Sequence, residues 1–487
     1  MSTANVSEAP SRGAVSSGHP EATSAAVRIL AAGGTAADAT IAAQAVIATV
    51  MPHAAGLGGD MLALIHGPGG SVHAVNGLGR SPAVRPPVYA ADGGSSVTVP
   101  GLVDGWVVMH RRWGRLPLTE VLADAIRFAA EGYLVDERLA RAARIQGPRI
   151  SGFGGADWAL LATPAGSLWR QPEVGRLLED IARHGRDAFY TGAAARSLAA
   201  AVSREGGALT TEDLAVHVTA EPPPVQTAWA GGRLYVQPAP SQGVLLAMAA
   251  RWVQQEKNLP SEGWDHVLVE ATEAAFAHRA DAAGDPERLL SIDLDVDRHR
   301  ARRLGGPRGY LHTAGVAVAD ADGMVLSSLV SVFDDFGSGV FVPDLGIVLN
   351  NRAAGFTVGA NAPGPGRRPV HTLAPALTVD RRGRPLAVAT PGADGQVQTL
   401  LQVLTRTRFT RDSVAQAISA PRWRSEAGRL LIESGHPATG DLAARGHDVV
   451  VRENGDDVFG AVVAAGVDAD GPFAAADWRR TVTKGTA

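Results

Sequence analysis

Apolar residues recur at helical spacing through most of the first half of the chain. Two alanine-rich segments, residues 20–32 and 36–50, flank Gly33-Gly34 and are predicted to be helices. Pro52 and the glycine-rich run 56–59 end the second helix and begin a tight loop, after which residues 61–65 are predicted to form a strand. The same spacing predicts further helices over residues 102–112, 118–131, 173–183, 193–204, 244–256 and 264–278.

After Pro307 the pattern changes to short aliphatic and β-branched runs separated by turns such as Asp322-Gly323. These runs predict strands over residues 311–319, 324–332, 340–349, 373–379 and 386–390. One more helix is expected over residues 397–405. Helices followed by strands, without strand–helix–strand alternation, favour a layered α+β fold over a doubly wound sheet.

Composition narrows the function classes. The chain has 487 residues, of which 45% are hydrophobic and 19% charged, as in globular proteins with a large core. A net charge of −4 gives no electrostatic basis for binding nucleic acid. The absence of cysteine excludes disulfides, thiolate nucleophiles and cysteine-bound zinc. The polar start and the short apolar run 39–50 predict a cytoplasmic protein without a membrane partner.

Common local motifs do not reveal the chemistry. The chain has no Gly-x-Ser-x-Gly elbow, no His-Glu-x-x-His and no phosphate-binding loop with lysine. The glycine-rich run 56–59 follows a helix and lacks lysine, which favours a structural turn. The fourteen histidines show no ligand spacing that we recognise, so no metal is expected.

A series of ordered motifs runs through nearly the whole chain. The opening segment is SSGHPEATSAAVRILAAGGTAADATIAAQAVIATVMPHAAGLGGDML, and Val99-Pro100-Gly101 precedes RRWGRLPLTEVLADAIRFAAEGY. Leu209–Leu214, Pro240–Gly243 and Ala476–Arg480 follow. Each motif alone is weak, but together and in this order they resemble the γ-glutamyltransferase family. The resemblance implies the four-layer αββα sandwich of N-terminal-nucleophile hydrolases, without a cofactor.

The resemblance also implies a nucleophile. In the family, a threonine begins a strand ten residues before the glycine of an Asp-x-Asp-Gly turn, and counting back from Gly323 reaches Thr313. Self-cleavage before Thr313 would yield a large subunit, residues 1–312, and a small subunit, residues 313–487. The freed α-amine, with a pKa of about 7.7–8, can then act as the base for the hydroxyl of the same residue.

Further site residues are implied by the same alignment. Ser331 stands where the family has a hydroxyl that bonds the nucleophile, and Thr372 is expected to help orient it. The segment 390–396, TPGADGQ, resembles the family's oxyanion turn, with the N–H groups of Gly392 and Ala393 as donors. Ala393 replaces a glycine, which suits a negative φ and is awkward for a positive one.

The positions that recognise the glutamyl group in the family are changed. Leu78 and Phe333 stand in place of an arginine and an asparagine, and His371-Thr372 replaces a pair of serines. Arg352 replaces a hydrogen-bond acceptor, which favours an anionic group over an ammonium group. These features are similar to the acylase and amidohydrolase branch. Arg352, Arg80 and His371 are therefore the candidates for binding an acidic substrate, and Thr372 is expected at the same substrate-binding site. The short loop 356–371 favours hydrolysis over transfer.

Three functions follow. The first is an amide hydrolase that acts on a small-molecule amide and consists of two subunits from one chain. The second is a homologue that cleaves a carbon–carbon bond in natural-product biosynthesis, as relatives making alkylproline units do. The third is an unprocessed binding protein, because His312, Ala314 and Gly315 are unusual neighbours for the nucleophile.

Overall fold

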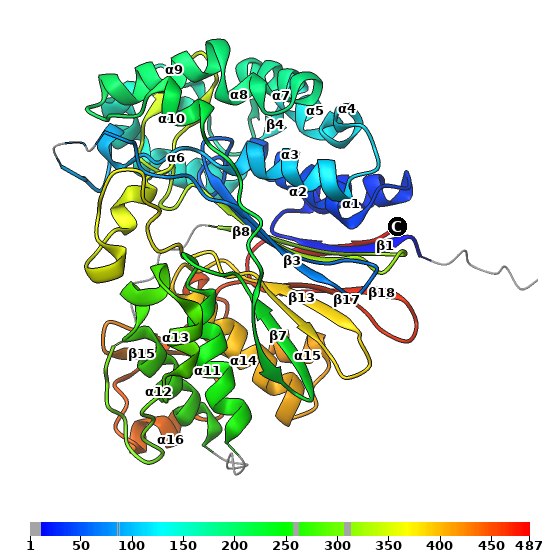
Figure 1. The fold of residues 1–487 in the computed structure, drawn as a ribbon, viewed down its shortest axis with the longest axis vertical. Helices are drawn as coiled ribbons and strands as arrows, with labels where there is room; N and C mark the ends of the chain where they lie inside the picture. Colours follow the sequence, from blue (N-terminus) through cyan, green and yellow to red (C-terminus); the bar gives the residue numbers. More distant parts are fainter. Residues whose placement is uncertain (1–10, 85, 87, 257–262, 306–312) are drawn as a thin grey trace, which may run out of the picture.

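Two six-stranded antiparallel sheets lie face to face between two layers of helices (Figure 1). The structure, a computed structural model, describes residues 11–84, 86, 88–256, 263–305 and 313–487. The expected α+β class and four-layer αββα arrangement are confirmed. No helix in the described part of the chain is long and apolar enough to cross a membrane.

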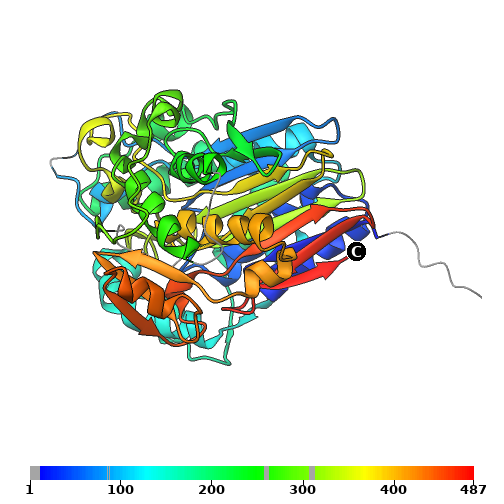
Figure 2. The same ribbon diagram turned by 90° about the horizontal axis from the view of Figure 1, so that it is seen from below.

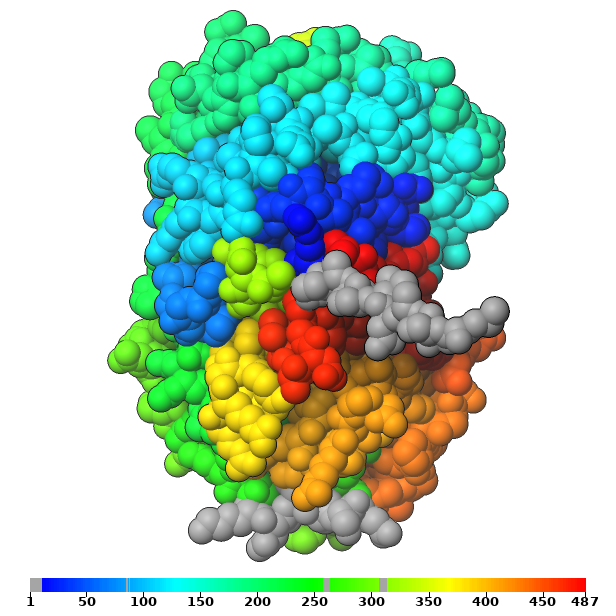
Figure 3. Space-filling view, turned by 90° about the vertical axis from the view of Figure 1, so that its right-hand side faces the viewer, coloured from blue at the N-terminus to red at the C-terminus, as the bar shows by residue number. Residues whose placement is uncertain are grey.

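The first sheet combines strands from both halves of the sequence. Its order is β19-β1-β8-β9-β2-β3. The strands are β1 (Gly13–Ser17), β2 (Asp60–His66), β3 (Val72–Gly77), β8 (Ala314–Asp320), β9 (Val325–Ser331) and β19 (Thr483–Thr486). Because β1 pairs with β19, the N-terminal and C-terminal segments lie side by side, blue against red in Figure 3.

The second sheet has the order β18-β17-β13-β12-β7-β6. Its strands are β6 (Val225–Trp229), β7 (Gly232–Val236), β12 (Ala376–Val379), β13 (Pro385–Ala389), β17 (Val463–Val467) and β18 (Pro472–Ala476). The two sheets pack through small and aliphatic side chains such as Ala317, Leu329, Ala387 and Val463. Both faces of the central strands are therefore buried, and every residue of β8 and β9 is buried. The buried Ser327 and Ser328 of β9 donate to the carbonyls of Val388 and Leu62.

Helices cover the outer face of each sheet. Over the first sheet lie α1 (Pro20–Ala31), α2 (Ala36–Val50), α3 (Leu102–Trp113), α4 (Leu118–Val121), α5 (Ala123–Glu131), α6 (Glu137–Ile150), α7 (Pro172–His184), α8 (Asp187–Tyr190), α9 (Gly192–Arg204) and α10 (Thr211–Ala215). Over the second lie α11 (Gly243–Gln255), α12 (Trp264–Phe276), α13 (Pro286–Ser291), α14 (Gly395–Phe409), α15 (Val414–Ser419) and α16 (Thr439–Ala444), seen from below in Figure 2.

Shorter strands complete the chain. They are β4 (Tyr133–Leu134), β5 (Leu168–Trp169), β10 (Phe341–Val342), β11 (Ile347–Val348), β14 (Trp423–Glu426), β15 (Arg429–Glu433) and β16 (Val449–Arg452). The strand expected over 340–349 is thus a hairpin, β10–β11, and the helix expected over 118–131 divides at Leu122. Residues 311 and 312 of another expected strand lie outside the described residues.

α2 is buried along its whole length between the first sheet and the surrounding helices. Thr35 and Asp38 form a capping box that satisfies the N–H groups of its first turn. The buried amide of Gln44 donates to Ser328 Oγ at 2.7 Å and accepts from Trp106 Nε1 at 2.8 Å. These bonds remove the cost of placing polar groups in the core, so α2 holds its end, and the loop after it, in a fixed position beside β8.

Candidate active site

Thr313 stands immediately before β8, and its side chain is buried. β8 runs between β1 and β9 in the first sheet. The register that pairs Ala314 with Val330 places Thr313 opposite Ser331, the last residue of β9. Ser331 Oγ accepts a hydrogen bond from the backbone N–H of Phe333 at 2.9 Å. The expected nucleophile and the hydroxyl expected to bond it therefore share one cross-strand position.

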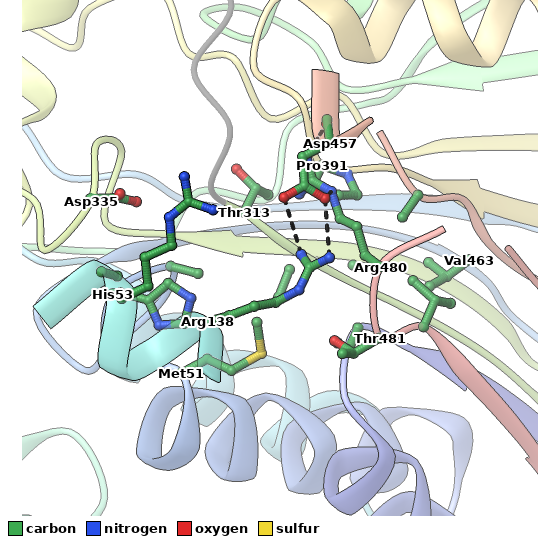
Figure 4. Close-up of a pocket in the computed structure, with 18 of the residues that line it drawn as sticks. Met51, His53, Arg138, Thr313, Asp335, Pro391, Asp457, Val463, Arg480 and Thr481 are labelled. Carbon is green, nitrogen blue, oxygen red and sulfur yellow. Dashed lines mark hydrogen bonds and ion pairs between the residues drawn. The ribbon is translucent and has the colours of Figure 1, made fainter. Parts of the chain in front are cut away.

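A cavity of about 270 Å³ lies beside Thr313 (Figure 4). Thr313, Ala314 and Gly315 form part of its wall. The other walls come from distant segments: Gly18, the loop after α2, α6, Asp335, Pro391, the segment around Ala461, and Arg480 to Val482. Such convergence of segments on one concave space is typical of a small-molecule site.

Positive charge dominates this cavity. Arg138 binds both carboxylate oxygens of Asp457, at 3.3 and 3.2 Å, and Arg480 Nε lies 3.5 Å from the same carboxylate. Burial lowers the pKa of Arg480 to about 10, so it stays charged at neutral pH. Arg141, one helical turn after Arg138 on α6, has no hydrogen-bond or ion-pair partner among the described residues. The cavity can therefore neutralise an anionic ligand.

The turn before α14 forms another part of the wall through Pro391. Gly392 has a φ of 125° and Ala393 a φ of 48°. No described residue accepts a hydrogen bond from either N–H group, so both remain available to an oxyanion. Ala393 therefore has a positive φ, which is unfavourable for a residue with a side chain and costs about 1–2 kcal/mol. The amide of Gln242 holds it by donating to the Ala393 carbonyl at 2.9 Å.

Ser331 on β9 has β8 on one side and β2 on the other, and its partner on β2 is Asp60. Its carboxylate lies 3.3 Å from Arg352 Nε and 3.4 Å from His371 Nε2, and all three side chains are buried. Burial alone would raise the pKa of Asp60, but the His371 hydrogen bond and the Arg352 charge outweigh it and lower that pKa. Asp60 is therefore an ionised carboxylate on the strand next to Ser331.

The hydrogen bonds also define the state of His371. The backbone N–H of Leu373 donates to His371 Nδ1 at 3.1 Å, so Nε2 carries the proton and donates to Asp60. Burial and the neighbouring Arg352 lower the pKa of His371 to about 3. His371 is thus neutral over the whole physiological range.

The expected substrate-binding residues do not lie together on the cavity. Arg352 and His371 meet at Asp60, and the Arg352 guanidinium stacks on Phe333 with 4.4 Å to the ring centre. Thr372 is buried, and its carbonyl accepts from Gln242 Nε2 at 2.6 Å. Arg80 donates to the Gly366 carbonyl and lines a separate cavity of about 400 Å³. The direct contacts expected of these four residues with substrate stay predictions.

No sequence pattern pointed to a role for Asp60, Arg138, Arg141 or Arg480 in the site. Asp60 ends the quoted Gly-Leu-Gly-Gly-Asp motif, which was read only as a turn. α6 escaped detection because Gly147-Pro148 interrupts its end, although Asp136 caps its start by accepting from the Leu139 N–H at 2.7 Å. Burial of Leu139, Ala142 and Ala143 on one side leaves Arg138 and Arg141 free to face the cavity.

Among the residues described, no three potential metal ligands come together at this cavity. One group elsewhere, His266, Glu270 and His447, brings three potential ligands together, although no metal was expected from the sequence.

Comparisons with known proteins agree with the geometry. The chain is 32% identical to the oxamate amidohydrolase proenzyme of Klebsiella pneumoniae subsp. pneumoniae, over 94% of this chain and 95% of that protein. It is equally similar, 32% over 94% and 95%, to the glutathione hydrolase-like YwrD proenzyme of Bacillus subtilis. The crystal structure of cephalosporin acylase from Bacillus halodurans matches with a TM-score of 0.88 and 27% identity, over 100% of this chain and 98% of that one.

The Gamma-glutamyltranspeptidase family model matches residues 22–486. The family resemblance and the expected enzyme class are therefore confirmed. The chain belongs to the gamma-glutamyltranspeptidase family of self-processing, amide-cleaving enzymes.

Proposed function

We propose that the chain is a precursor that cleaves itself between His312 and Thr313 and then hydrolyses a small amide through an acyl-threonine intermediate. One observation carries the proposal: Thr313 lines the cavity and lies opposite Ser331 in the sheet. His312 lies outside the described residues. The products would be the large subunit, residues 1–312, and the small subunit, residues 313–487, and a cytoplasmic location stays a prediction.

Each site residue has a role in this scheme. The new α-amine of Thr313 accepts the proton of its own Oγ1, which attacks the substrate carbonyl. The N–H groups of Gly392 and Ala393 stabilise the oxyanion, and Ser331 donates to the nucleophile oxygen. The protonated amine then passes its proton to the departing nitrogen. Water, activated by the same amine, releases the acid and restores Thr313.

Other residues position this machinery. Gln242 Nε2 donates to the carbonyls of both Thr372 and Ala393, so it couples the His371-Thr372 segment to the oxyanion turn. The Asp60, Arg352 and His371 cluster supports Ser331 from the neighbouring strand. In this arrangement Arg352 positions Ser331 through Asp60, and it would contact the substrate directly only if the substrate extended to it.

The cavity favours an amide that carries a carboxylate near the scissile bond. Three arginines, Arg138, Arg141 and Arg480, face two carboxylates, Asp335 and Asp457, and Arg141 has no described partner. A volume of about 270 Å³ suits a small acyl group. The similarity to an enzyme named for oxamate, itself an amide with a carboxylate, supports this class.

Carbon–carbon cleavage and inert binding are less favoured, since the similar proteins are proenzymes named as hydrolases and acylases. A denaturing gel and intact mass of fresh protein test the cleavage: two fragments that meet at 312/313 are expected. A panel of carboxylated, neutral and γ-glutamyl amides, with Thr313→Ala as the control, tests the substrate class. A single uncut chain that still turns over substrate would contradict the proposal. Product ratios with a dipeptide acceptor present would separate hydrolysis from transfer.

A further inference from the structure

Three potential metal ligands converge far from the cavity, in the helical layer that covers the second sheet. His266 and Glu270 lie one turn apart on α12, and His447 follows α16; both helices are labelled in the lower part of Figure 1. Their exposed fractions are 0%, 1% and 7%. One ligand atom from each residue lies within 4.8 Å of the others.

Hydrogen bonding inside the protein does not satisfy this group. His266 Nδ1 lies 2.8 Å from His447 Nε2, and a single shared proton can serve only that pair. Glu270 Oε1 accepts from the backbone N–H of Arg302 at 3.1 Å, but its buried Oε2 has no hydrogen-bond partner among the described residues. A buried polar atom without a partner costs about 1–3 kcal/mol, so an occupant that bonds Oε2 would be favoured.

We propose that His266, Glu270 and His447 bind a divalent transition-metal ion of the zinc type. Two imidazole nitrogens and one carboxylate oxygen are ligands that zinc commonly takes, with a water molecule as the fourth. Ligands at positions i and i+4 of a helix lie on the same face, as a shared ion requires. At metal–nitrogen distances of about 2.0–2.1 Å, two ligand nitrogens stand slightly farther apart than the present 2.8 Å. A small movement of the His447 ring would provide the space.

The ion would join the two pieces of the processed chain. His266 and Glu270 belong to residues 1–312, whereas His447 belongs to residues 313–487. Two neighbouring hydrogen bonds already join the same two parts of the chain: the backbone N–H of Ala301 donates to the Arg445 carbonyl at 2.9 Å, and the side-chain Nε of Arg303 donates to the Gly446 carbonyl at 2.6 Å. This consequence, unlike metal binding itself, rests on the proposed cleavage.

The test uses the full chain after chelator treatment and dialysis. Zn²⁺ is titrated by calorimetry, and Co²⁺ by its visible absorption, which reports coordination geometry. We expect one ion per chain and a tetrahedral cobalt spectrum. Glu270→Gln preserves the size of the side chain and an oxygen for the Arg302 N–H, and it should weaken Zn²⁺ binding at least about 10-fold. His447→Ala should abolish the cobalt spectrum.

Two controls make the result decisive. His184→Ala removes an exposed histidine of α7 and should leave Zn²⁺ binding unchanged. Thr313→Ala, which stays uncut if the proposed function holds, should bind Zn²⁺ as the wild type does, so the metal test is independent of processing. Absence of stoichiometric Zn²⁺ and Co²⁺ binding, or equal Zn²⁺ affinity in a folded Glu270→Gln variant, would overturn the proposal. Thermal melting by circular dichroism verifies that each variant is folded.

Discussion

Asp60 and Arg352 form an ion pair 3.3 Å apart in which both side chains are buried. The pair joins the first residue of β2 to the segment after β11, and Asp60 is in turn the cross-strand neighbour of Ser331. Arg352 is buried against Asp60, whereas Arg141 lines the cavity and has no partner among the described residues, so Arg141 is better placed than Arg352 to receive an anionic substrate.

Removing one partner of this pair should be costly. Arg352→Met leaves an uncompensated carboxylate in the core, and we expect it to lower the free energy of unfolding by about 3–5 kcal/mol. Urea unfolding measures the change. Arg384→Met, which breaks the half-exposed pair with Asp380, is the matched control and should cost less than about 1 kcal/mol. A stable Arg352→Met protein with a raised KM would instead support direct substrate binding.

Thr313→Ala removes the hydroxyl to which the proposed function assigns both cleavage and turnover. We expect a single chain of 50.3 kDa on a denaturing gel and a loss of at least about 10⁴-fold in amide hydrolysis. Thr313→Ser retains a hydroxyl and should still be processed, at a lower rate. Efficient turnover by Thr313→Ala would show that another residue is the nucleophile.

Arg141→Gln removes the cavity arginine that has no described carboxylate partner. We expect KM for a carboxylated amide to rise about 10-fold or more, with kcat much less affected, because a charge-assisted hydrogen bond contributes about 1.5–3 kcal/mol. The KM for a neutral amide should hardly change. Arg144→Gln, on the same helix but outside the cavity wall, is the control. Equal effects of both variants would mean that only the overall charge matters.

His371 gives a pH-dependent contribution to stability. Its pKa falls from 6.5 to about 3 on folding, because the folded protein holds His371 in its neutral form. The contribution of neutral His371 to the free energy of unfolding is therefore fully present above pH 6.5 and is lost as the pH falls from 6.5 toward 3. His371→Gln should therefore be more destabilising at pH 8 than at pH 5, by about 2 kcal/mol. Urea unfolding of both proteins at the two pH values measures this difference. A pH-independent difference would mean that His371 is not kept neutral.

Ala393→Gly tests the backbone of the oxyanion turn. Since Ala393 has a φ of 48°, glycine should relieve strain and raise the free energy of unfolding by up to about 1 kcal/mol, with activity retained. Ala200→Gly, in the exposed interior of α9, should have the opposite sign and cost about 1 kcal/mol. A destabilised Ala393→Gly protein would argue against this conformation.

The sequence pattern predicted those helices and strands that are determined by neighbouring residues, such as a capping residue and a continuous apolar run. α2 spans the expected residues because Thr35 caps it and its apolar residues continue to Val50. The family resemblance, rather than a local pattern, pointed to Thr313 as the nucleophile; the structure places this residue immediately before β8, and its role stays a prediction. α6 was missed because Gly147 and Pro148 conceal a helix that its N-cap and apolar side support.

Contacts between distant residues could not be predicted in this way. Arg352 meets Asp60 across 292 positions, and His447 meets His266 across 181. The charge of Arg352 suggested a role with substrate, whereas its partner becomes visible only when the segment after β11 lies beside the start of β2, as the bridge between Gly58 and Leu349 shows. The His266 and Glu270 spacing was present in the sequence, but two residues without their third partner carry little information.

The proposed cut would make refolding of the first sheet depend on the association of two chains, because both fragments contribute strands to it. β1, β2 and β3 come from residues before the cut, and β8, β9 and β19 from residues after it, so β1 lies between β19 and β8, and β9 pairs with β2. The two fragments cannot dissociate without breaking the backbone hydrogen bonds between these strands, so we expect the cleaved enzyme to stay assembled while it is folded. Once unfolded, however, it would have to reassemble from two chains. Its recovery should then depend on protein concentration, whereas that of the uncut precursor should not.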